Sequence, residues 1–204
     1  MKKDSCSQAG ENNPKINLGA IKVNKSIPLI LFLLVIFGVK IGTVSANTKD
    51  SPPPSIEETF SEAGFKTVEE SVEEFENYFE CDVELPRMTP SISFTHRFGR
   101  FYEDKQYNMN HSLAIRFVNK DIRENIYKID IRPLKNKINF KDKLNLNGKE
   151  FTLQDGSKAI YFESHQFNFL VFEKNDLQYL LGIYRKVPNT VTPESLVKIA
   201  NSIK

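Results

Sequence analysis

A run of thirteen residues near the N-terminus, Ile27 to Val39, carries no charged and almost no polar side chain. A helix on the surface of a soluble core would show polar residues at every third or fourth position, and this run does not. After it come Lys40 and a second uncharged stretch that ends in small residues at Ala46. The pattern predicts that residues 27–46 are directed to a membrane.

Two interpretations of residues 27–46 stay open. The apolar run followed by Val44, Ser45 and Ala46 fits a signal peptide, which would yield a secreted protein after cleavage behind Ala46. The same twenty residues would make about 30 Å of helix, enough for a single-pass anchor if Lys40 reaches the outer interface. The long segment before the run favours the uncleaved anchor.

The charge of the chain changes sign along its length. Residues 1–26 carry a net charge of +3, residues 47–80 a net charge of −8, and residues 81–204 a net charge of +6. Lysines before a membrane segment tend to stay in the cytoplasm, so the N-terminus is expected inside and the C-terminal domain outside. The overall charge of +2 gives no reason to expect nucleic acid as a partner.

Three consecutive prolines, at positions 52–54, follow the membrane segment within an acidic stretch. Such runs favour an extended, semi-rigid backbone. The expected organisation is a lysine-rich cytoplasmic segment at 1–26, the membrane segment at 27–46, a Pro-rich acidic linker at 47–64 and an extracytoplasmic domain at 65–204.

The domain is expected to begin and end with amphipathic helices. Thr67 and Glu70 have the spacing of a capping box, and an apolar stripe follows up to Phe79. Thr192 and Pro193 start a second helix. Between them, alternating residues and Gly or Asn turns predict strands joined by short hairpins, at 92–95, 112–118, 127–132, 151–153, 158–163, 167–172 and 177–184. The expected fold is α+β: an antiparallel meander of six or seven strands flanked by the two helices.

The cysteines give little reason to expect chemistry. Cys81 follows a strongly acidic helix, which disfavours a reactive thiolate. Cys6 would lie on the other side of the membrane, so no disulfide is expected.

The histidines offer one catalytic alternative. His96 and His111 could meet across a hairpin, and Glu163 or His165 could join them in a zinc or general-base site of an envelope hydrolase. No pair has the spacing of a helical metal motif, and no nucleophile elbow, phosphate loop or dinucleotide fingerprint occurs. We therefore expect no catalytic residue, no metal and no cofactor.

One aromatic and basic cluster is a weak candidate surface: His96, Arg97, Arg100, Phe101 and Tyr102. Its charges and rings would suit an anionic cell-wall polymer. The sixteen phenylalanines and seven tyrosines would also give the sheet a broad apolar face. That face is expected to form the core, or, if it stays open, to hold a lipid or peptide in a carrier-like domain.

The order of several motifs resembles a known family. These are GKEFTL (148–153), SKAIYF (157–162), FLVFEKNDLQYLL (169–181) and PESLVKIANSI (193–203), preceded by EEFENYF (73–79) and VELP (83–86). The chain resembles, over residues 67–203, extracytoplasmic domains of unknown function from Gram-positive bacteria, found in anti-sigma-factor-like membrane proteins and in small exported proteins.

The resemblance implies a cell-envelope protein that binds or senses an envelope protein or polymer without catalysis. The inner segment of 26 residues is too short to fold as a sigma-factor-binding domain. The tryptophan usual in the penultimate strand of the family is replaced by Phe172.

Overall fold

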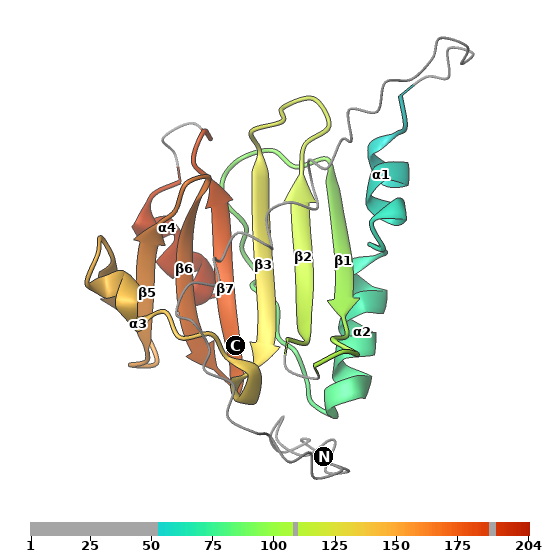
Figure 1. The fold of residues 1–204 in the computed structure, drawn as a ribbon. Helices are drawn as coiled ribbons and strands as arrows, with labels where there is room; N and C mark the ends of the chain where they lie inside the picture. The colour runs from blue at the N-terminus through green and yellow to red at the C-terminus, as the bar shows by residue number, and fades with distance from the viewer. Residues whose placement is uncertain (1–52, 108–109, 188–190) are drawn as a thin grey trace, which may run out of the picture. The chain divides into compact units, whose positions relative to one another are not determined.

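Seven strands form one antiparallel sheet in the computed structural model, which describes residues 53–107, 110–187 and 191–204 (Figure 1). The strands are β1 His96–Tyr102, β2 Ser112–Val118, β3 Ile126–Pro133, β4 Lys149–Thr152, β5 Lys158–Glu163, β6 Phe167–Lys174 and β7 Leu177–Tyr184. The described residues also form four α-helices and a 3-10 turn: α1 Ile56–Glu62, α2 Val68–Phe79, η2 Leu134–Asn136, α3 Lys141–Leu144 and α4 Pro193–Ala200.

The strand order is β1-β2-β3-β7-β6-β5-β4, so the sheet joins two meanders rather than forming one. The number of strands and their antiparallel pairing agree with the prediction, but the single meander does not. The connection between β3 and β4, residues 134–148, contains η2 and α3 and carries the chain to the far edge of the sheet (Figure 1). Because this connection is long, it leaves the edge of β3 open for β7, with Ile129 opposite Leu181.

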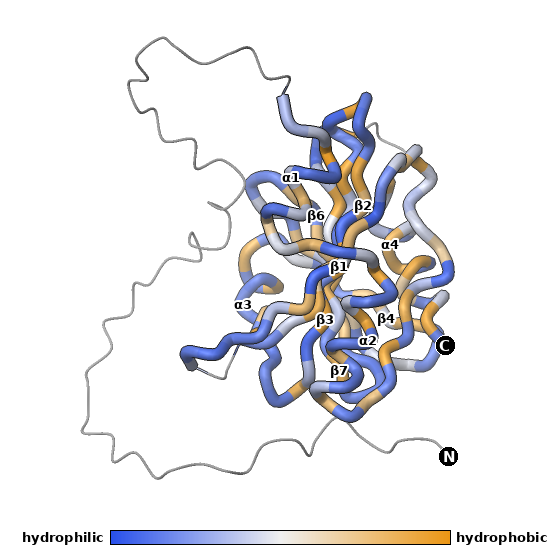
Figure 2. The backbone as a smooth tube through the Cα atoms, turned by 90° about the vertical axis from the view of Figure 1, so that its right-hand side faces the viewer, coloured by the Kyte–Doolittle hydropathy of each residue, from blue (hydrophilic) through white to orange (hydrophobic). Residues whose placement is uncertain are grey.

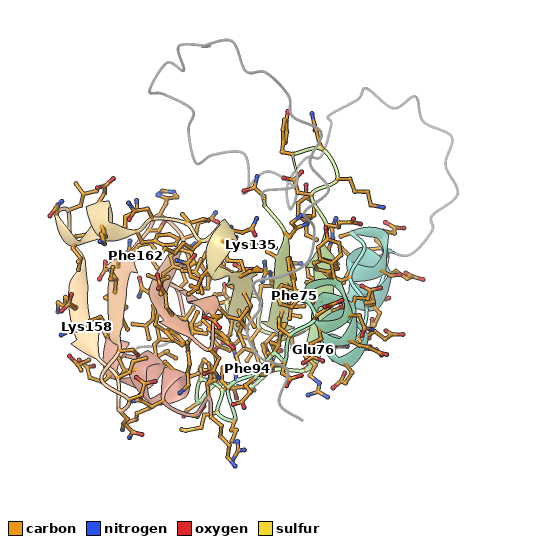
Figure 3. The ribbon with its side chains drawn as sticks, turned by 90° about the horizontal axis from the view of Figure 1, so that it is seen from below. Phe75, Glu76, Phe94, Lys135, Lys158 and Phe162 are labelled. Atoms are coloured by element: carbon orange, nitrogen blue, oxygen red, sulfur yellow. The ribbon has the colours of Figure 1, made fainter. Side chains whose placement is uncertain are left out.

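The helix α2 packs against the β1 end of the sheet. The Thr67 side chain accepts from the backbone of Glu70 and the Glu70 side chain bonds back to Thr67, which confirms the predicted capping box. Phe75 and Phe79 are buried, and Figure 3 shows Phe75 between α2 and the strands. The close approach requires glycine at position 99, because a Cβ atom there would lie 2.8 Å from the Thr67 carbonyl oxygen.

The core lies on one face of the sheet, here called the core face. It takes alternate residues of the central strands, such as Ile129, Ile131 and Leu181, each at most 2% exposed. Leu196 and Ile199 of α4 belong to the same cluster of buried residues. Figure 2 shows hydrophobic and hydrophilic positions interspersed in the sheet, and along β3 buried residues alternate one by one with half-buried ones. This is the period expected when neighbouring side chains point to opposite faces.

Two predicted segments have a secondary structure that the sequence analysis did not expect. The helix α1 lies within the predicted linker 47–64, because Ser55 and Glu58 form a capping box that starts a helix directly after the prolines. Residues 92–95 do not form a strand, although Phe94 packs against Phe117 at a ring distance of 5.6 Å. The apolar alternation there reflects packing, and the first strand, β1, follows immediately.

The outer edge of β1 is partly occupied by the chain between α1 and α2. Lys66 forms an antiparallel bridge with Gly99, with both backbone hydrogen bonds at 2.8 Å. This contact holds the start of the domain to the sheet edge.

Two buried tyrosines provide a matched test of the core. Tyr127 is fully buried, and its hydroxyl has no hydrogen-bond partner among the described residues. Tyr179 is equally buried, but its hydroxyl donates to the Glu84 carbonyl at 3.1 Å. A buried hydroxyl without a hydrogen-bond partner has lost its hydrogen bonds to water and formed none within the protein, which lowers the stability of the fold.

We therefore expect Tyr127→Phe to leave the free energy of unfolding unchanged or to raise it by about 1 kcal/mol, and Tyr179→Phe to lower it by about 1 kcal/mol. Urea unfolding of both variants beside the wild type measures the difference. If the two variants lose the same free energy of unfolding, the Tyr127 hydroxyl is not without a hydrogen-bond partner and the prediction is wrong.

Candidate functional site

The predicted aromatic and basic cluster lies on β1, but the strand divides it between two faces. Gly99 and Phe101 face α2 and the core, whereas Phe98 lies on the opposite face, here called the outer face, where it stacks on Phe60 of α1 at 4.3 Å. By the alternation of the strand, the predicted residues fall into two sets, with Arg97 and Phe101 on the core face and His96, Arg100 and Tyr102 on the outer face. They do not form one surface.

The charges of this cluster are already engaged within the chain. His96 Nε2 lies 2.7 Å from Glu57 Oε1, and Arg97 donates to Glu69 at 2.8 Å. Arg100 donates to the carbonyl oxygen at the end of α1 at 2.7 Å. These groups therefore hold α1 and α2 against β1, and they are poorly placed to bind a polymer.

The three histidines do not come together. His96 pairs with Val118 at one end of the β1–β2 hairpin, and His111 lies at the other end, about 20 Å away at the rise of a strand. His165 lies in the turn between β5 and β6. Within the part of the chain that the structure describes, no group of three or more His, Cys, Asp or Glu side chains is arranged to hold a metal ion. The conceivable zinc or general-base site is not assembled.

A different set of charged side chains comes together on the outer face, at the centre of the sheet. Lys128, Asp130 and Arg132 alternate along β3 and therefore point to the same side. Arg116 lies opposite Lys128 on β2, and its Nη2 is 2.7 Å from Asp130 Oδ1. We call Arg116, Lys128, Asp130 and Arg132 the charged patch.

The Lys128 side chain lies across the neighbouring strand β7. Its ammonium is 4.3 Å from the ring centre of Phe167 and 4.7 Å from that of Phe169, both on β6. The strand between them carries Gly182 opposite both Lys128 and Phe169. These contacts are cation–π interactions, which orient the ammonium without neutralising it.

Glycine at position 182 makes this arrangement possible. A Cβ atom there would lie 2.8 Å from Lys128 Cε and 2.9 Å from Phe169 Cε1. Glycine in the interior of a strand weakens the sheet and often marks a place where another group approaches closely. Here that group is the lysine stem.

The surroundings shift the protonation equilibria of the patch. Burial lowers the pKa of Lys128, an effect that Asp130 opposes and Arg116 reinforces. For Asp130, burial acts to raise the pKa, but the attraction of Arg116 and Lys128 outweighs it, so the pKa is lowered and the carboxylate stays ionised. Burial lowers the pKa of Arg132 as well, and Asp130 opposes this shift.

Two cations of the patch have unused donors. Arg116 is paired with Asp130 and also donates to the Ile115 carbonyl at 2.9 Å. By contrast, neither Lys128 nor Arg132 forms a hydrogen bond or ion pair with any residue in the described ranges. The patch is half-buried, since the side chains of Arg116 and Asp130 are 21% and 16% exposed. A partly dehydrated cation with free donors is a favourable binding point for an anion.

The connection 134–148 borders the patch on the β5–β6 side. Gln178 of β7 binds the backbone of Ile138 twice, donating to its carbonyl and accepting from its N–H, both at 2.9 Å. Phe140 stacks on Phe162 at 5.4 Å, and Figure 3 shows Phe162 on the side of the sheet where α3 lies. These contacts fix one wall beside the patch.

Sequence reasoning missed this site because its signals are separate in the chain. The alternation Lys128, Asp130, Arg132 was visible as the polar side of a strand, which is usually a solvated face. The other sign of the site in the sequence was a glycine, Gly182, inside a predicted strand. That Gly182 lies opposite Lys128 follows only from the pairing of β3 with β7.

Comparisons with known protein families, with curated proteins and with solved structures give no match to this chain. Within residues 53–107, 110–187 and 191–204, no helix combines the length and the apolar character needed to cross a membrane. The predicted membrane segment 27–46 and Cys6 lie outside these ranges. The membrane topology, the absence of a disulfide and the family resemblance therefore stay predictions.

His111 gives the domain a testable dependence on pH. It is 3% exposed, and its Nδ1 accepts from the Asp104 backbone N–H at 3.1 Å. Burial lowers the pKa of His111, while Asp104 and Glu103 act to raise it and Lys135 acts to lower it. Tyr78 faces the other ring nitrogen, at 3.5 Å from Nε2.

As the pH falls, the His111 ring is protonated in the unfolded chain before it is protonated in the folded one, because its folded-state pKa is the lower. The contribution of His111 to stability is therefore fully present above pH 6.5. It is lost as the pH falls from that value toward the folded-state pKa. We expect urea unfolding at about pH 7.5 and about pH 5 to show a smaller loss of stability for His111→Gln than for the wild type. The matched control is His165→Gln, which removes an exposed histidine outside this contact. An unchanged loss in His111→Gln would contradict the prediction.

Proposed function

We propose that this protein is a non-catalytic binding module of the bacterial cell envelope and that it binds an anionic ligand at the charged patch. In this proposal residues 27–46 anchor the chain as a single span with the N-terminus inside, and the domain lies outside. Cleavage after Ala46 would give a secreted form with the same site. The domain would be an α+β layer in which α2 and α4 flank the sheet.

The observation that carries this proposal is the position of Lys128. Its ammonium lies on two phenylalanine rings and is partly dehydrated, and no carboxylate in residues 53–107, 110–187 or 191–204 is bonded to it. Keeping a charge in such a place costs stability, and a methionine of similar length would fill the space without that cost. A charge retained under these conditions supports a role in binding.

The two other functions considered from the sequence receive less support. The His-dependent envelope hydrolase would need its histidines to meet, and they lie apart. A carrier would need a broad open apolar face. In the described residues, the large hydrophobic side chains that are at least a third exposed are scattered over different segments: Met88, Tyr102, Tyr107, Ile122 and Leu146.

Binding of anionic probes to the purified full-length chain in detergent tests the proposal. Short polyglutamate and polyphosphate are suitable probes, titrated at low ionic strength because salt screens exposed charges. We expect Lys128→Met to weaken binding about tenfold, as loss of a hydrogen bond to a charged group does. Gly182→Ala keeps every charge but displaces the lysine stem, and should weaken binding as well.

The matched control is Lys198→Met, which removes the same charge from an exposed position on α4. It should leave the affinity within about twofold of the wild type. If Lys128→Met and Lys198→Met lower the affinity equally, the attraction is non-specific and the charged patch is not the site. Thermal unfolding of each variant shows that the fold is kept, and Lys128→Met should be at least as stable as the wild type.

The topology has its own test. Protease added outside intact cells should digest residues 53–204, while a cytoplasmic marker protein stays whole. Protection of the domain in intact cells, with cleavage only after lysis, would contradict the proposed orientation.

A further inference from the structure

We infer that the ligand carries two acidic groups joined by a neutral spacer, one bound at Lys128 and the other at Arg132. This inference rests on the proposed anion-binding function and specifies the ligand. Lys128 and Arg132 lie on the same side of β3, four residues apart, which places their Cα atoms about 13 Å apart.

The two cations start from different places on the sheet. Arg132 lies opposite Gln178, whereas Lys128 lies opposite Gly182 on the same strand β7. The Lys128 ammonium reaches over Phe169 and also over Phe167, which pairs with Tyr184, still further from Gln178. The lysine therefore leans away from Arg132. With the lysine held in this direction, we do not expect one carboxylate or phosphate group to bridge the two residues.

A negative charge separates these two positions. Asp130 lies between Lys128 and Arg132 on β3 and is held in place by Arg116 at 2.7 Å. The Arg116–Asp130 pair is neutral as a whole, but its carboxylate repels an anion placed over the middle of the patch. The patch thus attracts negative charge at its two ends and disfavours it at the centre.

This pattern selects among anionic ligands. A polymer with evenly and closely spaced phosphates would bring a charge over Asp130. An extended peptide with acidic residues at positions i and i+4 has the same Cα separation as Lys128 and Arg132, because its backbone rises by about 3.3 Å per residue, as β3 does. A long acidic side chain such as glutamate can then follow the lysine toward its ammonium. Neutral residues between the two acids avoid the repulsion. The ligand that fits the patch is therefore an extended acidic segment of another protein.

Three blocked pentapeptides, built otherwise of threonine, test this with the full-length chain in detergent. One has glutamate at positions 1 and 5, the second at positions 1, 3 and 5, and the third at positions 1 and 2. We expect the 1,5 peptide to bind about tenfold tighter than the 1,2 peptide, although both carry two charges. The 1,3,5 peptide should bind no tighter than the 1,5 peptide, despite its additional charge.

Two variants identify the groups responsible. Arg132→Gln should remove the advantage of the 1,5 peptide over the 1,2 peptide. Asp130→Asn should make the 1,3,5 peptide the tightest ligand, because the central repulsion is gone and Arg116 is released. The order of the three peptide affinities for the wild-type protein tests the inference even if a variant folds poorly.

The outcomes separate the inference from the function on which it rests. If affinity follows only the number of charges and still depends on Lys128, the two-point pattern is wrong and the anion-binding function stands. If polyglutamate or polyphosphate binds through Lys128 but no peptide binds, the inference is wrong and the anion-binding function stands. If neither the polyanions nor the peptides bind, or if Lys128→Met leaves all their affinities unchanged, the proposed function itself is wrong. Binding in the order predicted supports both.

Discussion

The pairing of β3 with β7 is the interaction on which the rest of the domain depends. It joins a three-stranded meander to a four-stranded one, and it places Ile129 opposite Leu181 and Ile131 opposite Tyr179 at the middle of the core face. On the outer face the same register sets Lys128 opposite Gly182. A slip of one residue would exchange the two faces of β7 and would remove both the core contacts and the glycine that admits the lysine.

The charged patch and the core therefore impose opposite demands on one strand. The core-face residues of β3 are apolar and fully enclosed, and they stabilise the sheet by burial. The outer-face residues of β3 bring two cations and one carboxylate to a half-buried position beside Arg116 of β2. Among the described residues of this patch, the ion pair joins Arg116 to Asp130. Such an arrangement lowers stability locally, and proteins usually keep it where binding requires it.

Local patterns were sufficient to predict most elements of the domain. The capping box at Thr67, the Thr192–Pro193 helix start and the alternation of β2, β5 and β7 depend on neighbouring residues only, and each element begins within a residue of its predicted start. The strand β1 escaped prediction because Arg97 and Gly99 stand on its core side, where apolar residues were expected. The strand order and the charged patch escaped it because both depend on β3 meeting β7, which are separated by more than forty residues.

The late position of β7 in the sequence also affects how the chain reaches its fold. A chain that emerges from its N-terminal end completes β1, β2 and β3 well before β7 appears. During that interval one side of β3 presents free backbone donors and acceptors beside an apolar face, the kind of edge that pairs with other chains. When the last hairpin forms, β7 pairs with β3 and covers this edge. In a chain truncated before residue 177, the backbone groups along that edge of β3 would stay unpaired and able to bind other chains.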